Sequence, residues 1–284
     1  MAIENGILFG LLVVVLWGFA KIPAKKAMGI IGPYYALFYE HLVVALVVVL
    51  GAFPFIDFAI PSRDIMLTII AAAVIGAFGI YFLFRGMHDG KVSIVSPIAH
   101  SSAIITVLLA YIIYDEKMTL IKWVSVALLI TGTMLISFKY SSLRKLRLSG
   151  VLPGVKYAFL AMILWGAFFF AIKPIVVSLG PLLAAVYVEV GVSALIAVPL
   201  IFKGLRSPGK ATKYFVASGT AVAAASILFN AAIERSAVSL IYPLASSSPL
   251  ITVILSYFLL EERIETNQKI AILLIIPGII MASL

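Results

Sequence analysis

The stretch "VSIVSPIAHSSAIITVLLAYIIYDEK", residues 92–117, returns in altered form as "VSLIYPLASSSPLITVILSYFLLEER", residues 238–263. A constant shift of 146 residues pairs Pro97 with Pro243 and brings the serine, threonine and acidic positions into the same order. Hydrophobicity alone aligns any two membrane segments, but it does not align these polar positions. The chain is therefore predicted to contain an internal duplication.

The first apolar segment of each half repeats as well. "LWGFAKIPAKK", residues 16–26, corresponds at a shift of 148 to "LWGAFFFAIKP", residues 164–174, so that Lys25 matches Lys173. Lys21 has no counterpart in the second copy. We expect the matched lysines to belong to the shared architecture, and Lys21 to be a residue on which the specificity of this protein depends.

Composition places the chain in a lipid bilayer. Of the 284 residues 63% are apolar and 12% are charged, and the mean hydropathy is +1.18, whereas soluble domains are about 25% charged. Crossing the hydrocarbon layer takes about 20 apolar residues in a helix, and the sequence contains ten runs close to this length. They lie near 6–27, 33–56, 65–86, 92–114, 119–138, 152–177, 181–203, 211–233, 238–260 and 267–284.

The predicted fold class is thus an all-α integral membrane protein with ten transmembrane helices. The first five-helix repeat covers 5–138, a basic linker covers 139–151, and the second repeat covers 152–283. Because each repeat has an odd number of spans, the second enters the membrane from the opposite face, and the repeats are inverted. Inverted repeats are common in secondary transporters, where they expose a central site to each side in turn.

Other function classes are disfavoured. The chain has no cysteine, which excludes disulfides and thiolate chemistry, and it has none of the nucleotide-binding or hydrolase motifs, so neither an enzyme nor a cofactor is predicted. The net charge of +9 comes mostly from helix ends and short loops, which indicates membrane orientation rather than nucleic-acid binding. The excess lies on the side of the odd-numbered loops, which favours external termini. The expected partners are the bilayer and a small-molecule substrate, with the chain a monomer or weak homodimer in the cell membrane.

The paired motifs are similar to those of a known family. Each half has Trp-Gly followed by a lysine eight residues after the Trp, then "GP" before its second helix, and a Ser/Pro-containing fourth helix that ends in acidic residues. This pattern resembles the EamA family of the drug/metabolite transporter superfamily. The resemblance implies a ten-helix inverted-repeat carrier with a central cavity, and cargo such as amino acids, other metabolites, nucleotide sugars or drugs. It also implies cytoplasmic termini, contrary to the charge count, and many relatives place an arginine where Glu40 and His41 stand here.

Ionisable residues inside a membrane span are costly and usually face a partner or a wet cavity. Two alternatives stay open for each: the lysines bind cargo or extend to the lipid headgroups, and the acids take up protons or form simple ion pairs. Histidine, serine and tryptophan positions line the cavity or serve helix packing. The candidate substrate-binding residues are Lys21, Lys25, His100, Lys173, Ser101, Ser247, Trp17 and Trp165. The candidate proton-coupling residues are Glu40, His41 and Glu189, and the candidate gating residues are Pro97, Pro243 and Pro249.

Three functions compete at this level. The leading one is a secondary transporter of a small polar metabolite, an amino acid or related organic anion, with possible coupling to protons. The second is a proton-coupled exporter of cationic or amphipathic drugs, in which Glu40 or Glu189 binds cargo. The third, an integral membrane enzyme, is disfavoured because the loops are too short to build a site outside the membrane.

Overall fold

The computed structural model describes the chain except residues 1, 56–58, 90–91, 138–151 and 262, and within these limits it contains helices and no strand. The α-helices are α1 (Ala2–Ile31), α2 (Pro33–Ala52), α3 (Arg63–Asp89), α4 (Val92–His100), α5 (Ala103–Ile113), α6 (Leu120–Ile136), α8 (Leu152–Ala197), α9 (Leu200–Lys203), α10 (Thr212–Arg235), α11 (Val238–Ser246), α12 (Pro249–Leu260) and α13 (Thr266–Ala282). Two short 3₁₀ helices are also described, η1 (Phe53–Phe55) after α2 and η3 (Gly209–Ala211) before α10.

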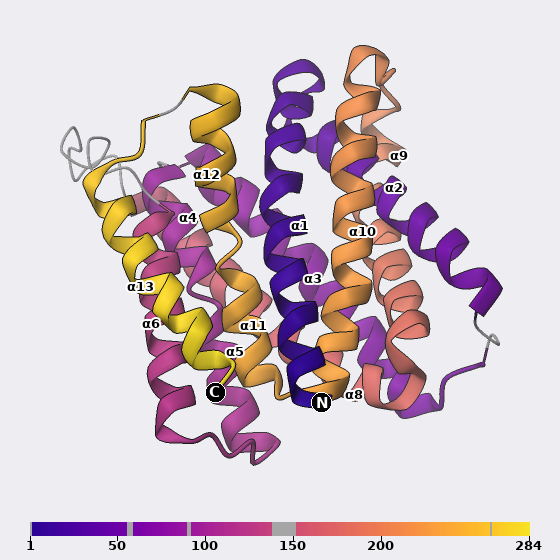
Figure 1. Cartoon of the computed structure of the whole chain (residues 1–284). Coiled ribbons are helices and arrows are strands. Elements are labelled where there is room, and N and C mark those ends of the chain that lie inside the picture. The colour runs from indigo at the N-terminus through magenta and orange to yellow at the C-terminus, as the bar shows by residue number, and fades with distance from the viewer. Residues whose placement is uncertain (1, 56–58, 90–91, 138–151, 262) are drawn as a thin grey trace.

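The helices form one bundle with both chain ends at the same end (Figure 1). We call this end the terminal face. In the described residues six helical segments are long and apolar enough to cross a membrane, and three further apolar helices are shorter. One of the six, Gly154–Phe202, contains the non-helical residue Gly180, whose φ of 75° and ψ of 166° divide α8 into two legs. Gly32, with a φ of 83°, makes the matching bend between α1 and α2, and glycine adopts such a positive φ readily because it lacks a Cβ.

Two helical segments are interrupted at matched positions. The helix that begins at Val92 breaks at Ser101 and Ser102, and the one that begins at Val238 breaks at Ser247 and Ser248. Each break comes four residues after a proline, and at the breaks the N–H groups of Ser102, Ser247 and Ser248 bond to carbonyls three residues back rather than four. The continuous runs predicted from hydrophobicity at these two places are therefore two short helices each.

Packing between the halves is reciprocal. An added Cβ on Gly18 would lie 2.5 Å from Ile251 Cβ, and one on Gly166 would lie 2.4 Å from Ile105 Cβ, so each glycine lets two helices approach closely. The hydroxyl of Thr252 donates to the carbonyl of Gly18 at 3.0 Å. Its counterpart Thr106 donates to the carbonyl of Gly166 at 2.9 Å. The two sets of contacts are equivalent, because the glycines are related by the shift of 148 residues and the isoleucines and threonines by the shift of 146.

Whole helices of one half also pack mainly on helices of the other half. α1 packs mainly on α10, α3 mainly on α8, and α6 mainly on α13. Gly132 of α6 faces Ile275, and Gly278 of α13 faces Leu129, in one further close pair. Most of the buried apolar side chains form a single core that draws on both halves, so the halves fold against each other rather than as separate bodies.

Candidate functional site

A charged cluster joins three apolar helices, of which α1 and α2 are candidate membrane spans. Lys21 lies on α1, Glu40 and His41 on α2, and His100 at the end of α4. The Lys21 ammonium is exposed, although its neighbours Ala20 and Ile22 are buried, and it acts electrostatically on Glu40, His41 and His100. Its charge therefore acts on residues of both α2 and α4. We call Lys21, Glu40, His41 and His100 the charged cluster.

The charged cluster lies well inside the bundle. Lys21 is ten residues from the end of α1 at Ile31, and Glu40 is seven residues from the start of α2 at Pro33. At 1.5 Å per residue these are depths of about 15 and about 10 Å, measured from the face opposite the termini. The sequence predicted each of these residues as a site candidate, and the structure brings them together.

Helix α10 provides serines to two carboxyl groups. The Ser226 hydroxyl donates to Glu189 Oε1 at 2.6 Å, and Ser218, whose hydroxyl donates to the carbonyl of Phe215 at 3.3 Å, lies close to the Glu40 carboxyl. The two serines are eight residues apart on α10, about 12 Å along its axis. Glu40 and Glu189 thus occupy two levels of the bundle, Glu189 nearer the terminal face, and neither carboxyl forms a direct ion pair within the described residues.

The two histidines lie in different surroundings. Within the described part of the chain, His41 Nδ1 is buried and has no hydrogen-bond partner, while the His41 carbonyl accepts a hydrogen bond from Ser193 at 2.8 Å. The His100 ring lies 6.3 Å from the ring of Trp165. A buried nitrogen without a partner is uncommon in folded proteins, so Nδ1 of His41 is available to a ligand or a proton.

An aromatic group lies between the halves. The Trp17 ring stacks on Phe229 at 5.7 Å, and Phe169 stacks on Tyr242 at 4.0 Å. The buried hydroxyl of Tyr242 shares a hydrogen bond of 2.7 Å with Ser102, at the break between α4 and α5. Large aromatic side chains in such contact add packing beyond the area that they bury. These four aromatic residues therefore pack residues of both halves against one another.

The predicted serines and prolines lie at the helix breaks. The Ser101 hydroxyl donates to the carbonyl of Ile98 at 2.6 Å, and the Ser247 hydroxyl donates to the carbonyl of Leu244 at 2.6 Å. Each hydroxyl therefore satisfies a carbonyl of its own helix end, and could offer cargo only its acceptor lone pairs. Pro97 lies in α4, Pro243 in α11, and Pro249 at the first position of α12. Their gating role stays a prediction.

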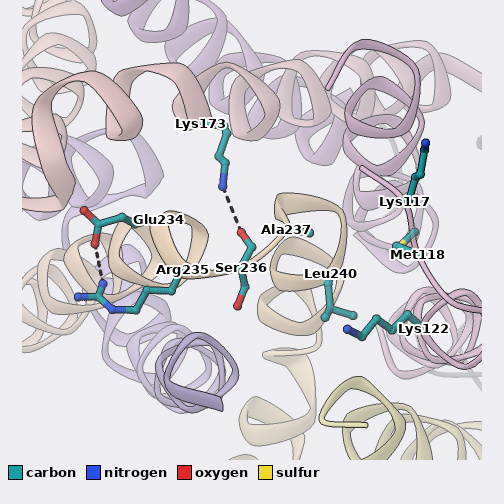
Figure 2. Close-up of a pocket in the computed structure, with 9 residues that line it drawn as sticks. All are labelled: Lys117, Met118, Lys122, Lys173, Glu234, Arg235, Ser236, Ala237 and Leu240. Carbon is teal, nitrogen blue, oxygen red and sulfur yellow. Dashed lines mark hydrogen bonds and ion pairs between the residues drawn. The ribbon is translucent and has the colours of Figure 1, made fainter. Parts of the chain in front are cut away.

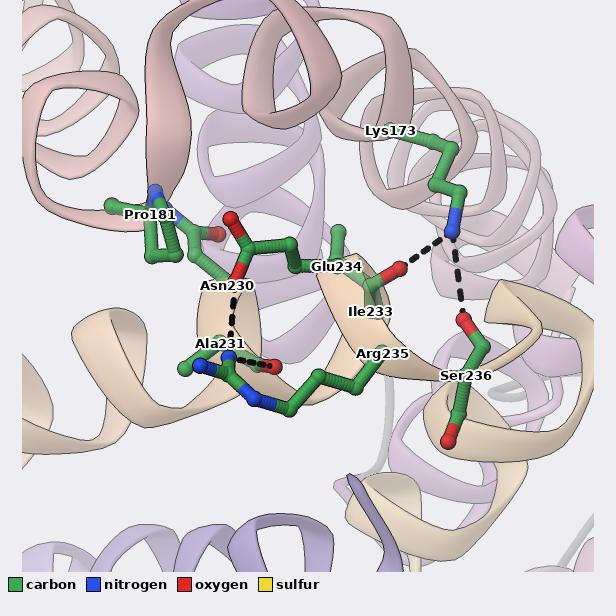
Figure 3. A network of polar contacts seen from close by, with 8 residues as sticks. All are labelled: Lys173, Pro181, Asn230, Ala231, Ile233, Glu234, Arg235 and Ser236. Carbon is green, nitrogen blue, oxygen red and sulfur yellow. Dashed lines mark hydrogen bonds and ion pairs between the residues drawn. The ribbon is translucent and has the colours of Figure 1, made fainter. Parts of the chain in front are cut away.

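The matched lysines lie apart from the charged cluster. Lys25 is exposed, one turn beyond Lys21 on α1. Lys173 lies near the terminal face, where its ammonium donates to the carbonyls of Ile233 and Ser236 (Figure 3). Cations are favourable at helix C-termini because the last carbonyls lack partners. Lys173 thus contacts the end of α10, and a role in cargo binding stays a prediction for both lysines.

A solvent cavity of about 280 Å³ lies beside Lys173 at the terminal face (Figure 2). Its wall includes one ion pair, in which Arg235 and Glu234 are 2.7 Å apart. The lining residues are Lys117, Met118, Lys122, Lys173, Glu234, Arg235, Ser236, Ala237 and Leu240. In the described residues no group of three or more metal-binding side chains is assembled.

Several contributors were not identified from the sequence. Ser218 and Ser226 are serines on an alanine-rich helix, and nothing in their spacing points to carboxyl partners on other helices. Tyr242 did carry a signal, because the residue at the matching position of the first half is Ser96. The two halves therefore differ in side-chain size at this position, although the sequences around it are similar.

Comparisons with known proteins agree with the duplication. The model of the EamA-like transporter family matches residues 4–138 and again residues 152–284. An uncharacterised protein of Methanocaldococcus jannaschii is 28% identical over 138 residues, which make up 47% of this chain and 97% of that protein. That protein therefore corresponds to about half of this chain. A crystal structure of a protein 16% identical to this chain superposes over 98% of this chain and 96% of its own, with a TM-score of 0.81, and shows the same fold.

Proposed function

Because the chain belongs to the EamA-like transporter family, a family of membrane proteins that transport small molecules, we propose that it is a secondary transporter of a small polar metabolite. The proposed cargo is an amino acid or a related organic anion, carried across the cell membrane. The family is one of transporters and not of enzymes. The observation that carries the proposal is the charged cluster, since an exposed ammonium inside a membrane bundle can bind a carboxylate or phosphate at little desolvation cost.

The proposed architecture is ten membrane crossings in two inverted repeats, 5–138 and 152–283. Its support is the division of α8 into two legs at Gly180, the three shorter apolar helices beside the long ones, and the reciprocal glycine and threonine contacts. Two inverted halves of similar energy can exchange conformations, which would open the central site to each side alternately.

The proposed division of labour follows from the geometry. Lys21, exposed among two histidines and a carboxyl group, binds the negative group of the cargo. Glu40 and Glu189 are the groups that gain and lose a proton, because each lies beside a serine of α10 and has no direct cation partner within the described residues, and because the two serines lie at different levels of α10. His41, with its free Nδ1, is placed beside Glu40 for the same exchange.

A ligand screen by thermal shift tests the proposal. The purified protein is heated with amino acids, sugar phosphates or cationic drugs at two pH values, and a compound that binds the folded state raises the unfolding midpoint. We expect stabilisation by carboxylate-bearing or phosphate-bearing compounds in the wild type and not in Lys21→Ala. Stabilisation only by cationic compounds would contradict the proposed cargo.

One observation favours a second candidate, the proton-coupled exporter of cationic compounds. Within the described residues, Glu189 and Glu40 provide two carboxyl groups inside candidate spans, and Lys21 is the cation that acts on Glu40. In this function, Glu189→Gln with Glu40→Gln would abolish the stabilisation by cationic compounds and Lys21→Ala would not. Unchanged stabilisation by these compounds in the double variant would remove this candidate.

A further inference from the structure

One carboxylate from the end of α5 lies on the start of α11. Glu116 Oε1 accepts the backbone N–H of Val238 at 3.1 Å, and Oε2 accepts that of Ser239 at 2.9 Å. The first N–H groups of a helix have no partner within it, and the residue before α11, Ala237, has no side chain that could accept them. Glu116 therefore provides from another helix the cap that α11 lacks, and its negative charge matches the helix dipole.

Glu116 is held in place by its neighbour. The Tyr114 hydroxyl donates to the carbonyl of Phe170 at 3.1 Å, and the two rings stack at 4.4 Å. The end of α5 is thus anchored to α8.

Lys173 acts on the other side of the same connection. Its ammonium donates to the carbonyls of Ile233 and Ser236, at the end of α10 (Figure 3). Lys173 and Glu116 also attract each other electrostatically. The short connection between α10 and α11 is therefore clamped by a cation at the end of one helix and an anion at the start of the next.

The clamped connection separates the terminal-face cavity from the interior. The cavity reaches Leu240, which is 2% exposed, and every residue of α11 is buried (Figure 2). The cavity therefore borders directly on a fully buried helix. Lys21 of the charged cluster is exposed on α1, whereas α11 is buried along its whole length.

We infer that Glu116 and Lys173 form a latch that holds the terminal face closed, and that both contacts break when this face opens during transport. The inference rests on the proposed transport cycle and adds two gating residues to it. The matching positions of the other half are Glu262 and Lys25, of which Glu262 lies outside the described residues. If the latch exists, removing Glu116 or Lys173 changes how accessible the terminal face is to solvent, and it does so without any cargo.

The chain has no cysteine, so single cysteines report accessibility without background. Leu240→Cys reports the terminal side, and Lys21→Cys reports the opposite side. The rate of reaction with a charged maleimide is measured for each reporter in detergent, with Glu116→Gln or Lys173→Met added. Hydrogen bonds to charged groups contribute enough that losing the latch should speed labelling at 240 by about tenfold or more, while labelling at 21 slows.

The matched control is Asp115→Asn, because Asp115 pairs with Lys117 at 3.5 Å in a fully solvated position beside Glu116. It should change neither labelling rate. Unchanged labelling at 240 in both latch variants would overturn the inference, and so would faster labelling at both reporters, since that indicates general loosening rather than a gate. Labelling needs no cargo, so a failure of the latch is distinguishable from a failure of the proposed function, which the ligand screen tests.

Discussion

The hydrogen bond between Tyr242 and Ser102 gives the sharpest energetic prediction. It joins α11 to the break between α4 and α5, and both residues are buried, with 3% and 0% exposure. Tyr242→Phe keeps the ring on Phe169 but leaves the Ser102 hydroxyl buried without this partner, which costs about 1–3 kcal/mol of unfolding free energy. Ser102→Ala leaves the Tyr242 hydroxyl unpaired and should cost a similar amount.

The double variant separates this bond from other effects. When both hydroxyls are removed no buried group is left unpaired, so the double variant should lose less than the sum of the two single losses, with a coupling of about 0.5–3 kcal/mol. The free energy of unfolding is measured in mixed micelles by titration with a denaturing detergent. Additive single losses would refute the role of this bond in joining the two broken helices.

Two more predictions concern close packing and the second carboxyl group. Gly18→Ala and Gly166→Ala should each lower the free energy of unfolding by about 1–3 kcal/mol through overpacking, because the added methyl groups would lie 2.5 and 2.4 Å from isoleucine Cβ atoms. Gly29→Ala, with nothing within 4 Å, is the control, and an equal loss there would contradict the packing explanation. Ser226→Ala removes the donor to Glu189 and should shift the pH dependence of transport without abolishing ligand binding; an unchanged pH profile would separate Glu189 from proton coupling.

The duplication could be predicted because it includes matched glycine and polar positions, which a shared hydrophobicity does not explain. Gly18 and Gly166 match at one fixed shift, and Thr106 and Thr252 match at another. The structure shows why these positions persist, since each threonine hydroxyl donates to the glycine of the other half. The repeated glycine and threonine positions thus indicated residues that make contacts between the halves, which neither segment alone would have indicated.

The partners of individual polar groups could not be predicted in the same way. Ser101 and Ser247 were expected to line a binding site, yet their hydroxyls donate to carbonyls three residues earlier in their own helices. Lys173 matches Lys25 in sequence and lies on the end of α10, which is adjacent only after folding. Side-chain chemistry identified these residues as candidates, but the partner of each depends on how distant helices pack.

Transport by reconstituted protein tests most directly whether Lys21 binds the cargo. Counterflow of the amino acid or organic anion selected by the ligand screen is measured in proteoliposomes for the wild type, Lys21→Ala and Lys26→Ala. Lys26 is a suitable control because it is exposed on the same helix, with its ammonium 5.8 Å from the ring of Tyr214. We predict that Lys21→Ala lowers the initial rate by about tenfold or more, as expected for loss of a charged hydrogen bond, and that Lys26→Ala keeps the wild-type rate. Wild-type counterflow in Lys21→Ala would contradict the proposed site.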